Sequence, residues 1–349
     1  MLSSLASVDV PALVRIKPGA LDRLGVYVER ARWSRVALVR SAGLPGHLEA
    51  RLRSALSGVD VLLDSVEDVP SLDAAARLLA ALPQRCQVVV AFGGGRALDL
   101  AKHTASIAGL PFLAVPTSLS HDGFASPVAS LHTVGGRRSI ACRPPAGVII
   151  DTGVCFAAPR HLWLAGLGDV AAKVTAVADW KLAFHARGEP VNDLAALLSD
   201  ATVFQLAARP VFDLEGTRLL ATALLLNGVA MSLAGTSRPA SGSEHLISHA
   251  LDQLSARPRL HGLQVGIAAY IVAQLQGRGQ DRVASLLDSS GFFDAIASDP
   301  FSRLEWLRAV EQAPRVKDDF YTVLSTRDVS AEVAHLTRED PRLARCFIE

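Results

Sequence analysis

The chain has 349 residues, more than one hydrophobic core usually organises, so its length favours two domains. Half of the residues are hydrophobic and only 20% are charged, which excludes an extended disordered chain. Thirty-five Lys+Arg against 34 Asp+Glu give a net charge of +1, so the chain has no overall basic field with which to bind nucleic acid.

The cysteines and the amino terminus both indicate a cytoplasmic protein. Cys86, Cys142, Cys155 and Cys346 show no CxxC spacing, which argues against a zinc ribbon or a disulfide framework and favours reduced thiols. Residues 1–19 contain no cationic start followed by a long apolar run, so we expect no signal peptide.

Short apolar runs alternate with helical patterns through the first 150 residues. Continuous apolar strands separated by helices indicate a parallel sheet covered on both faces, as in open nucleotide-binding α/β domains. We expect a hairpin or connecting loop at 134–145. The expected strands are 36–39, 59–63, 87–92, 112–115 and 147–150, and the expected helices are 46–56, 72–82 and 96–108.

From about Pro159 onward, Ala/Leu-rich stretches at helical spacing replace the Val/Ile runs, for example at 161–187 and 264–276. We therefore expect a Rossmann-like domain over 1–158 and a mostly α-helical domain over 159–349. The apolar stretch 219–234 contains Asn227 and falls short of the roughly 18 to 20 residues that a membrane span needs, so it is interpreted as a buried core helix.

Gly93, Gly94 and Gly95 lie where a predicted buried strand ends and a helix begins. Glycines there let the backbone turn tightly, and the unpaired N–H groups of the helix start attract phosphate oxygens. The pattern fits a pyrophosphate cradle and a ligand-free turn equally well. On the same helix, Asp99 is placed to orient the turn, and Lys102 is either a phosphate ligand or a solvated surface lysine.

A second turn, 116–123, follows the strand 112–115 and concentrates hydroxyls, an imidazole and a carboxylate. In open α/β sheets, ligands bind at the carboxyl ends of the strands. A helix cap built by Ser120 or Asp122 explains the same composition.

Four residues of the second half have the composition of a metal site. His245 and His249 are four residues apart, on one helical face, and His261 follows. Asp169 lies in an otherwise apolar helical stretch, where an unpaired carboxylate is costly. Two histidines and one aspartate with an open fourth position are the ligand set of a catalytic zinc or iron centre. Spacing alone nevertheless favours explaining each histidine as an ordinary hydrogen-bonded residue.

Together these motifs resemble the superfamily of iron- and zinc-containing polyol dehydrogenases and dehydroquinate synthase, and most closely its glycerol-1-phosphate dehydrogenase branch. The similar segments follow the family's order over most of the chain. They are FGGGRALDLAK (92–102), VPTSLSHDGFASP (115–127), GLGDVAAKVTAVADWKLA (166–183), SRPASGSEHLISH (237–249) and LHGLQVG (260–266).

The resemblance implies a Rossmann-like domain, a helical domain and an active site in the cleft between them. It implies that Asp169, His245 and His261 hold one divalent metal, with zinc expected first and Fe2+ or Ni2+ as alternatives. It implies that His249 touches substrate or metal-bound oxygen and relays a proton. It also implies that Asp122 forms hydrogen bonds with the substrate hydroxyls.

The resemblance also implies a cofactor, NAD(P)H, and a small phosphorylated substrate. The reaction of this branch is the reduction of dihydroxyacetone phosphate to sn-glycerol 1-phosphate. Candidates for the substrate phosphate are Lys173 and Arg238, which are equally explained as ordinary surface cations. The implied cofactor-binding residues are Gly93, Gly94, Gly95, Asp99, Lys102, Thr117 and Ser118.

Several alternatives stay open at this point. Asp64 favours NADH and nearby Arg40 favours NADPH, so the sequence does not choose between them. Arg96 replaces the lysine that relatives often carry after the glycines. A dehydrogenase of another small polyol or sugar phosphate is one alternative. A catalytically silent homologue that binds only nucleotide is another, although the full ligand set argues against it. A dehydroquinate synthase-like cyclase is disfavoured because such cyclases use Glu where this chain has Asp169. We also expect a homo-oligomer, with 219–234 as a candidate interface.

Overall fold

The computed structural model describes residues 8–134 and 136–349, which divide into two compact units. The N-terminal unit runs to Ser118 and resumes over Asp122–Ala158. The C-terminal unit comprises Leu119–His121 and Pro159–Glu349. Residues 1–7, the start of the stretch for which we expect no signal peptide, lie outside the described residues.

A six-stranded sheet forms the N-terminal unit, with strand order β1-β8-β5-β4-β2-β3 and parallel pairing throughout the described strands. This confirms the predicted parallel sheet. Each predicted strand is present, and one edge strand, β1, was not expected. The bounds are β1 (Leu13–Lys17), β2 (Arg35–Ser41), β3 (Asp60–Glu67), β4 (Val88–Gly93), β5 (Phe112–Pro116) and β8 (Gly147–Asp151).

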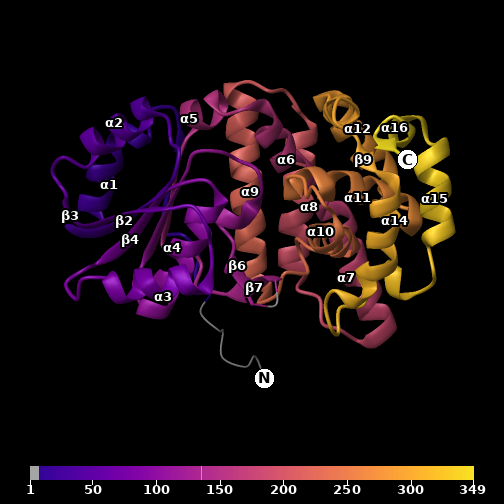
Figure 1. Ribbon diagram of the computed structural model, residues 1–349, viewed down its shortest axis with the longest axis horizontal. Helices are drawn as coiled ribbons and strands as arrows, with labels where there is room; N and C mark the ends of the chain where they lie inside the picture. The colour runs from indigo at the N-terminus through magenta and orange to yellow at the C-terminus, as the bar shows by residue number, and fades with distance from the viewer. Residues whose placement is uncertain (1–7, 135) are drawn as a thin grey trace. The chain divides into compact units, whose positions relative to one another are not determined.

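Burial explains why the central strands read as continuous apolar runs. Every residue of β4, β5 and β8 is buried, since helices cover both faces of the sheet. In Figure 1, α2 lies on one side of these strands, and α3 and α4 lie on the other. The helices of this unit are α1 (Leu24–Arg30), α2 (Gly46–Ala55), α3 (Leu72–Ala81), α4 (Gly95–Ala108) and α5 (Thr152–Ala157).

An antiparallel hairpin connects β5 to the last strand of the sheet. It pairs β6 (Val128–Thr133) with β7 (Gly136–Ala141), so of the two interpretations of 134–145 the hairpin is correct. Its first strand begins earlier than the sequence indicated, because β6 overlaps no long apolar run.

The C-terminal unit is mostly helical and is coloured from magenta through orange to yellow in Figure 1. A pair of two-residue parallel strands, β9 (Phe301–Ser302) and β10 (Phe347–Ile348), ties the chain end to this unit. The helices are α6 (Arg160–Ala171), α7 (Lys173–Arg187), α8 (Asp193–Ala207), α9 (Leu214–Ala234), α10 (Ser243–Leu254), α11 (His261–Gln276), α12 (Gln280–Ser290), α13 (Phe292–Ala297), α14 (Arg303–Gln312), α15 (Ser330–Glu339) and α16 (Pro341–Ala344).

Helix α9 corrects one argument about the apolar stretch 219–234. The helix has 21 residues, so by length and composition it is long enough to cross a membrane. The length argument was therefore wrong. The packing still supports a core helix, because α9 lies against α8 and α6 and fully buries the polar side chains of Thr217 and Asn227.

Candidate active site

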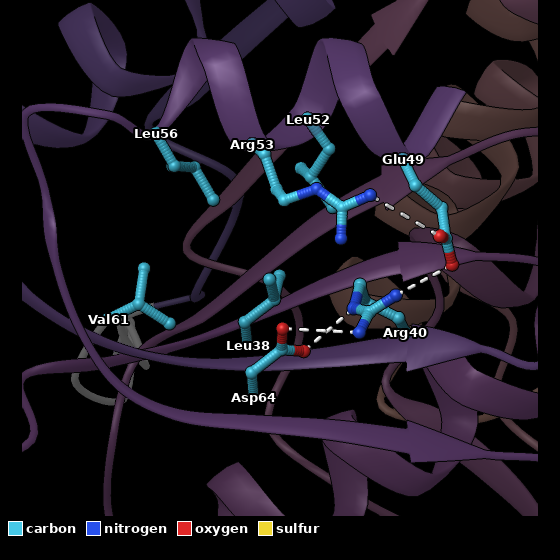
Figure 2. A pocket seen from close by; sticks show the side chains of 8 residues that line it. All are labelled: Leu38, Arg40, Glu49, Leu52, Arg53, Leu56, Val61 and Asp64. Atoms are coloured by element: carbon cyan, nitrogen blue, oxygen red, sulfur yellow. Dashed lines mark hydrogen bonds and ion pairs between the residues drawn. The ribbon is translucent and has the colours of Figure 1, made fainter. Parts of the chain in front are cut away.

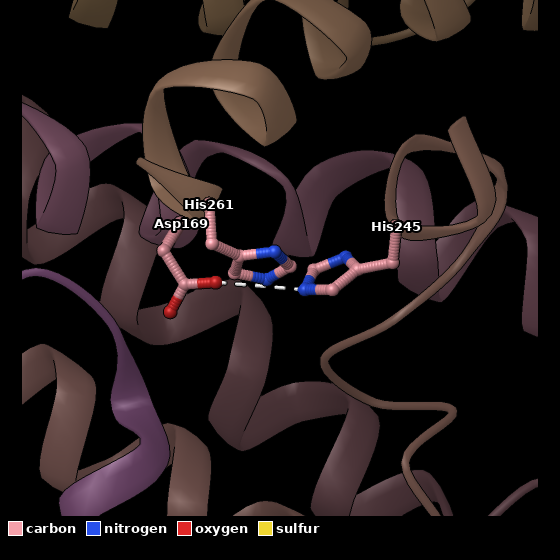
Figure 3. A group of neighbouring side chains, drawn as sticks. All are labelled: Asp169, His245 and His261. Atoms are coloured by element: carbon pink, nitrogen blue, oxygen red, sulfur yellow. Dashed lines mark ion pairs between the residues drawn. The ribbon is translucent and has the colours of Figure 1, made fainter. Parts of the chain in front are cut away.

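Three side chains of the C-terminal unit converge as the metal hypothesis requires. One ligand atom from each of Asp169, His245 and His261 lies within 4.8 Å of the other two (Figure 3). Nε2 of His245 is 3.5 Å from Oδ1 of Asp169. The three residues come from α6, α10 and the first position of α11, so tertiary packing alone brings them together.

Glycines at the crossing of α6 and α11 explain how Asp169 reaches His261. A Cβ atom on Gly168 would overlap the carbonyl oxygen of Gly262, and one on Gly262 would overlap that of Ala165. The two backbones therefore approach more closely than any other residue type would permit at these positions. The consequence is that a carboxylate of one helix meets an imidazole of the other.

The outer nitrogens of both imidazoles have oxygen partners. Nδ1 of His245 lies 2.9 Å from Oε1 of Glu244, and Nδ1 of His261 lies 3.0 Å from the Ser248 hydroxyl. A hydrogen on each Nδ1 directs the Nε2 lone pair to the opposite side of the ring. This is how metal-binding histidines are usually held. The donor set and its supports therefore fit a divalent metal.

Electrostatics keep the carboxylate ionised. Burial alone would raise the pKa of Asp169, but the Lys173 ammonium and the imidazoles of His245 and His261 outweigh it and hold the pKa below its ordinary value. Asp169 is therefore an anionic ligand over the whole physiological range. Its negative charge compensates part of the charge of a bound cation.

The pKa values of the two imidazoles shift in opposite directions. Burial and the neighbouring His245 and His249 push the pKa of His261 well below its ordinary value, so this ring is neutral, the form that binds metal. Burial also lowers the pKa of His245, but Asp169 and Glu244 outweigh it, and the net shift is upward. Metal binding at His245 therefore competes with a proton.

Two more histidines border this cluster. The ring of His249 stacks on His261 at 5.7 Å between centroids, and its centroid is 6.4 Å from that of His245. His121 belongs to the C-terminal unit by packing, and its ring meets His261 edge-on at 6.4 Å. His249 therefore lies beside the candidate ligand set.

In the N-terminal unit the glycine turn joins the end of β4 to the start of α4. Gly93 has φ +152°, and a Cβ there would overlap the Ser41 hydroxyl, which also accepts the N–H of Gly94 at 3.0 Å. Gly94 is the N-cap of α4 and has no neighbouring atom within 4 Å of a built Cβ. The first N–H groups of α4 thus begin at an uncrowded turn without a side-chain cap.

The second turn lies beside the first. Gly93 pairs with Pro116 at the ends of β4 and β5, and the N–H of Thr117 donates to the carbonyl oxygen of Gly93 at 3.0 Å. Thr117 and Ser118 therefore extend from the same edge of the sheet as the glycines. Asp122 opens the short turn Asp122–Phe124 in this unit, where its backbone carbonyl accepts from Ala125 and Ser126.

Residues 15–159 match the family of iron-containing alcohol dehydrogenases. The glycerol-1-phosphate dehydrogenase, NAD(P)+, of Aeropyrum pernix is 36% identical over 342 residues, which cover 96% of this chain and 97% of that protein. The protein of the same name from Pyrococcus furiosus is 40% identical over 264 residues, 71% of this chain and 74% of that protein. The chain belongs to the glycerol-1-phosphate dehydrogenase family.

Solved structures extend this family's fold to more distant relatives. A probable glycerol dehydrogenase from Sinorhizobium meliloti has a TM-score of 0.74 at 18% identity, over 96% of this chain and 99% of the other. A sulfoacetaldehyde reductase from Bifidobacterium kashiwanohense, in complex with NAD+, has a TM-score of 0.68 at 19% identity, over 97% and 100% of the two chains. The glycerol-1-phosphate dehydrogenase family therefore shares the fold of the iron-containing alcohol dehydrogenases.

Lys102 and Asp99, which were expected to support the cofactor in this protein, are both buried. The ammonium of Lys102 is fully buried and donates to the carbonyl oxygens of Gly123, Ser126 and Val128. Asp99 lies 3.3 Å from that ammonium. This placement corrects the idea that Lys102 reaches a phosphate, because both side chains bind the segment that follows the second turn.

The two candidate phosphate ligands are also committed elsewhere. Lys173 is fully buried, with Nζ 3.2 Å from Oδ1 of Asp169 and 3.1 Å from the carbonyl oxygen of Ala240. Arg238 is 1% exposed and forms a forked ion pair with Glu189 at 2.8 and 2.5 Å. Neither is an ordinary surface cation. The guanidinium of Arg238 is enclosed by protein acceptors and is not exposed to a substrate.

The residues that bear on NADH or NADPH preference bind each other. Arg40 donates to both oxygens of Asp64, at 2.7 and 3.2 Å, and to Glu49 at 2.8 Å (Figure 2). They line a cavity of about 180 Å³ between α2 and the strands β2 and β3. Because two carboxylates hold the guanidinium, the described geometry favours neither cofactor.

Sequence reasoning missed the outer partners of the metal cluster. Glu244 and Ser248 lie on α10 beside the ligands, and the only available signal was their position within the segment that carries His245 and His249. The polar partners that come from α7, among them Thr175, are distant in sequence. Nothing in the spacing of the chain points to those contacts.

Proposed function

We propose that the protein is a metal-dependent, NAD(P)-linked oxidoreductase that reduces dihydroxyacetone phosphate to sn-glycerol 1-phosphate. The observation that carries the proposal is the convergence of Asp169, His245 and His261 in a member of the glycerol-1-phosphate dehydrogenase family. One carboxylate and two imidazoles leave a coordination position for substrate, as in catalytic zinc sites.

The residues of the C-terminal unit supply the metal's surroundings. Asp169, His245 and His261 hold the ion, with zinc expected first and Fe2+ or Ni2+ as alternatives. A divalent metal held there would supply a Lewis acid for the substrate ketone, and a bound nicotinamide would supply the hydride. A ring nitrogen of His249, whose ring stacks on that of His261, donates the proton that the product oxygen needs.

The turns at the sheet edge are proposed to bind the cofactor. The N–H groups of α4, which begins at Gly95, hold the pyrophosphate. Gly93 and Gly94 form the close turn before the helix, where the Gly94 N–H donates to Ser41, and Thr117 and Ser118 line the nucleotide. We propose that Asp122 binds substrate hydroxyls. The names of the relatives support both NADH and NADPH as reductants.

Two further expectations complete the proposal. We propose a homo-oligomer, which is supported by the exposure of Leu194, Leu197 and Phe204 on one face of α8, at 62%, 66% and 56%. We also propose a cytoplasmic location, which is supported by the four cysteines, all described and all free.

The test follows NADH and NADPH absorbance with zinc-loaded protein and either dihydroxyacetone phosphate or dihydroxyacetone. We expect turnover of the phosphorylated ketone that stops with a chelator and returns when metal is restored. Turnover of only the unphosphorylated ketone would show that the substrate is not a phosphate ester. Full activity of the metal-free protein would show that the reaction does not require a metal.

A further inference from the structure

Two buried carboxylates outside the ligand set accept N–H groups at the start of α10, the helix that carries His245. The first is Glu244, which is fully buried. Its Oε1 accepts the N–H of Gly242 at 2.6 Å and lies 2.9 Å from Nδ1 of His245, and its Oε2 lies 2.8 Å from the Thr175 hydroxyl. These contacts fix the carboxylate, so the His245 ring that bonds to it has a fixed direction.

The second carboxylate is Asp179 of α7, which is also fully buried. Its Oδ2 accepts the N–H of Ser243 at 2.7 Å, and its Oδ1 accepts Val323 N–H and Gln276 Nε2, both at 2.9 Å. All three donors are neutral. Ser243 begins α10 and Gln276 ends α11, so one side chain joins the two helices that carry His245 and His261.

The start of α10 shows that this arrangement is close-packed. Its N-cap, Gly242, provides no side-chain cap, and Asp179 supplies the missing acceptor from another helix. A Cβ on Gly242 would lie 2.8 Å from Oδ2 of Asp179 and 3.0 Å from Oε2 of Glu244. The two carboxylates therefore approach each other at a position where any residue larger than glycine would displace its neighbours.

We propose that Glu244 and Asp179 are positioning residues that set the metal affinity of the site. Glu244 orients the imidazole of His245, and Asp179 fixes the turn of α10 from which Glu244 and His245 extend. The inference rests on the proposed function, because it concerns the same metal. Outer partners of this kind typically change metal affinity by about 10–100-fold.

A purely structural role of Glu244 and Asp179 predicts a different result. If the two carboxylates only cap a helix and fill the interior, their loss lowers the stability of the protein and leaves its metal affinity unchanged. Metal affinity of the folded protein is therefore the deciding measurement, and enzyme activity is not needed.

The experiment titrates metal-free protein with Co2+ against a competing chelator, at a temperature where circular dichroism shows every variant folded. Glu244→Gln and Asp179→Asn keep the side-chain size but remove a charge. Asp179→Asn also places an amide nitrogen among N–H donors. We expect each to bind Co2+ about 10–100-fold more weakly than the wild type. The cobalt absorption bands should also shift, because the ligand directions change.

Asp151→Asn is the matched control. Asp151 is 3% exposed and accepts N–H groups of Leu21 and Gly153 in the N-terminal unit, so its replacement also removes a buried, hydrogen-bonded carboxylate. We expect lower thermal stability with unchanged cobalt affinity and spectrum. Thr175→Val, which removes one hydroxyl from Glu244 and nearly keeps the shape, covers the case in which a carboxylate variant does not fold.

The outcomes separate this inference from the proposed function. If the wild-type protein binds neither Co2+ nor Zn2+, the proposed metal-dependent function is wrong. Wild-type protein that binds tightly, with Glu244→Gln, Asp179→Asn and Thr175→Val binding equally tightly, overturns only the positioning roles. If Asp179 acts through the α10 turn, the double variant should lose less affinity than the product of the two single fold-changes.

Discussion

The two units of this protein assemble their candidate sites in different ways. In the N-terminal unit, Gly93 to Gly95 and Thr117 to Ser118 follow adjacent parallel strands, so the topology of the sheet brings them together. In the C-terminal unit, Asp169, His245 and His261 come from three helices and meet only through close packing. The candidate cofactor turns therefore depend on two adjacent strand ends, whereas the candidate metal cluster depends on the packing of three helices.

The largest effect is expected from removing a metal ligand, which tests whether the three helices of the C-terminal unit form a metal site. His261→Ala should reduce metal affinity by more than about 100-fold, beyond the range for outer partners, because a direct ligand is lost. Metal content after dialysis measures this. His185→Ala, an exposed histidine of the same unit, should keep its metal; if both variants retain metal equally, the ligand assignment is wrong.

The glycine crossing provides the next largest effect. In Gly262→Ala, the new methyl group must displace Ala165, so α6 and α11 separate and the unfolding free energy falls by about 3 kcal/mol. Gly46→Ala adds a methyl group where no atom lies within 4 Å and should change stability little. Chemical denaturation compares the two. Equal stability of both variants would contradict the close-packed crossing.

The pH dependence of stability isolates Asp179. Burial and the neighbouring Glu244 raise the pKa of Asp179 to about 6 from 3.8. The native protein therefore holds a proton that the unfolded chain has released, and stability falls as pH rises between about 4 and 6. The two pKa values give a loss of about 2 kcal/mol over that range. Metal-free Asp179→Asn should lack this component in denaturation curves; a curve parallel to the wild type would refute the assignment.

The smallest expected effect is in the N-terminal unit. Gly94→Ala adds a methyl group to an uncrowded position, so stability should stay unchanged. A methyl group in a phosphate cradle should nevertheless raise the KM for NAD(P)H by about tenfold, equivalent to ~1.4 kcal/mol of binding. Steady-state kinetics and a melting curve measure the two effects. An unchanged KM would argue for a ligand-free turn.

Much of the fold could be predicted from the sequence, because β4, β5 and β8 are buried on both faces and read as continuous apolar runs. β1 was missed because its side chains are only partly buried and include Arg15 and Lys17. The length of α9 was underestimated because its first turn is polar, with Glu215 and Arg218.

For the site, residue type was informative and the environment of each residue was not. Asp169 was found because a carboxylate in an apolar helix needs a partner, and the structure places Lys173 and His245 beside it. Lys102 and Arg238 were interpreted as phosphate ligands or surface cations because composition does not show burial. Both are in fact enclosed by protein acceptors, carbonyl oxygens for Lys102 and the Glu189 carboxylate for Arg238.

The edge strand β1 has a consequence for how the protein is made. β1 pairs with β8, so Leu13 lies opposite Gly147, and the sheet joins nearly the first described residues to the last strand of its unit. During synthesis, β1 cannot pair until β8, which ends at Asp151, has left the ribosome. Strands so far apart in sequence pair slowly, so the backbone groups of β8 that bond to β1 are exposed for a time on the nascent chain. We expect a chaperone to bind this exposed strand edge.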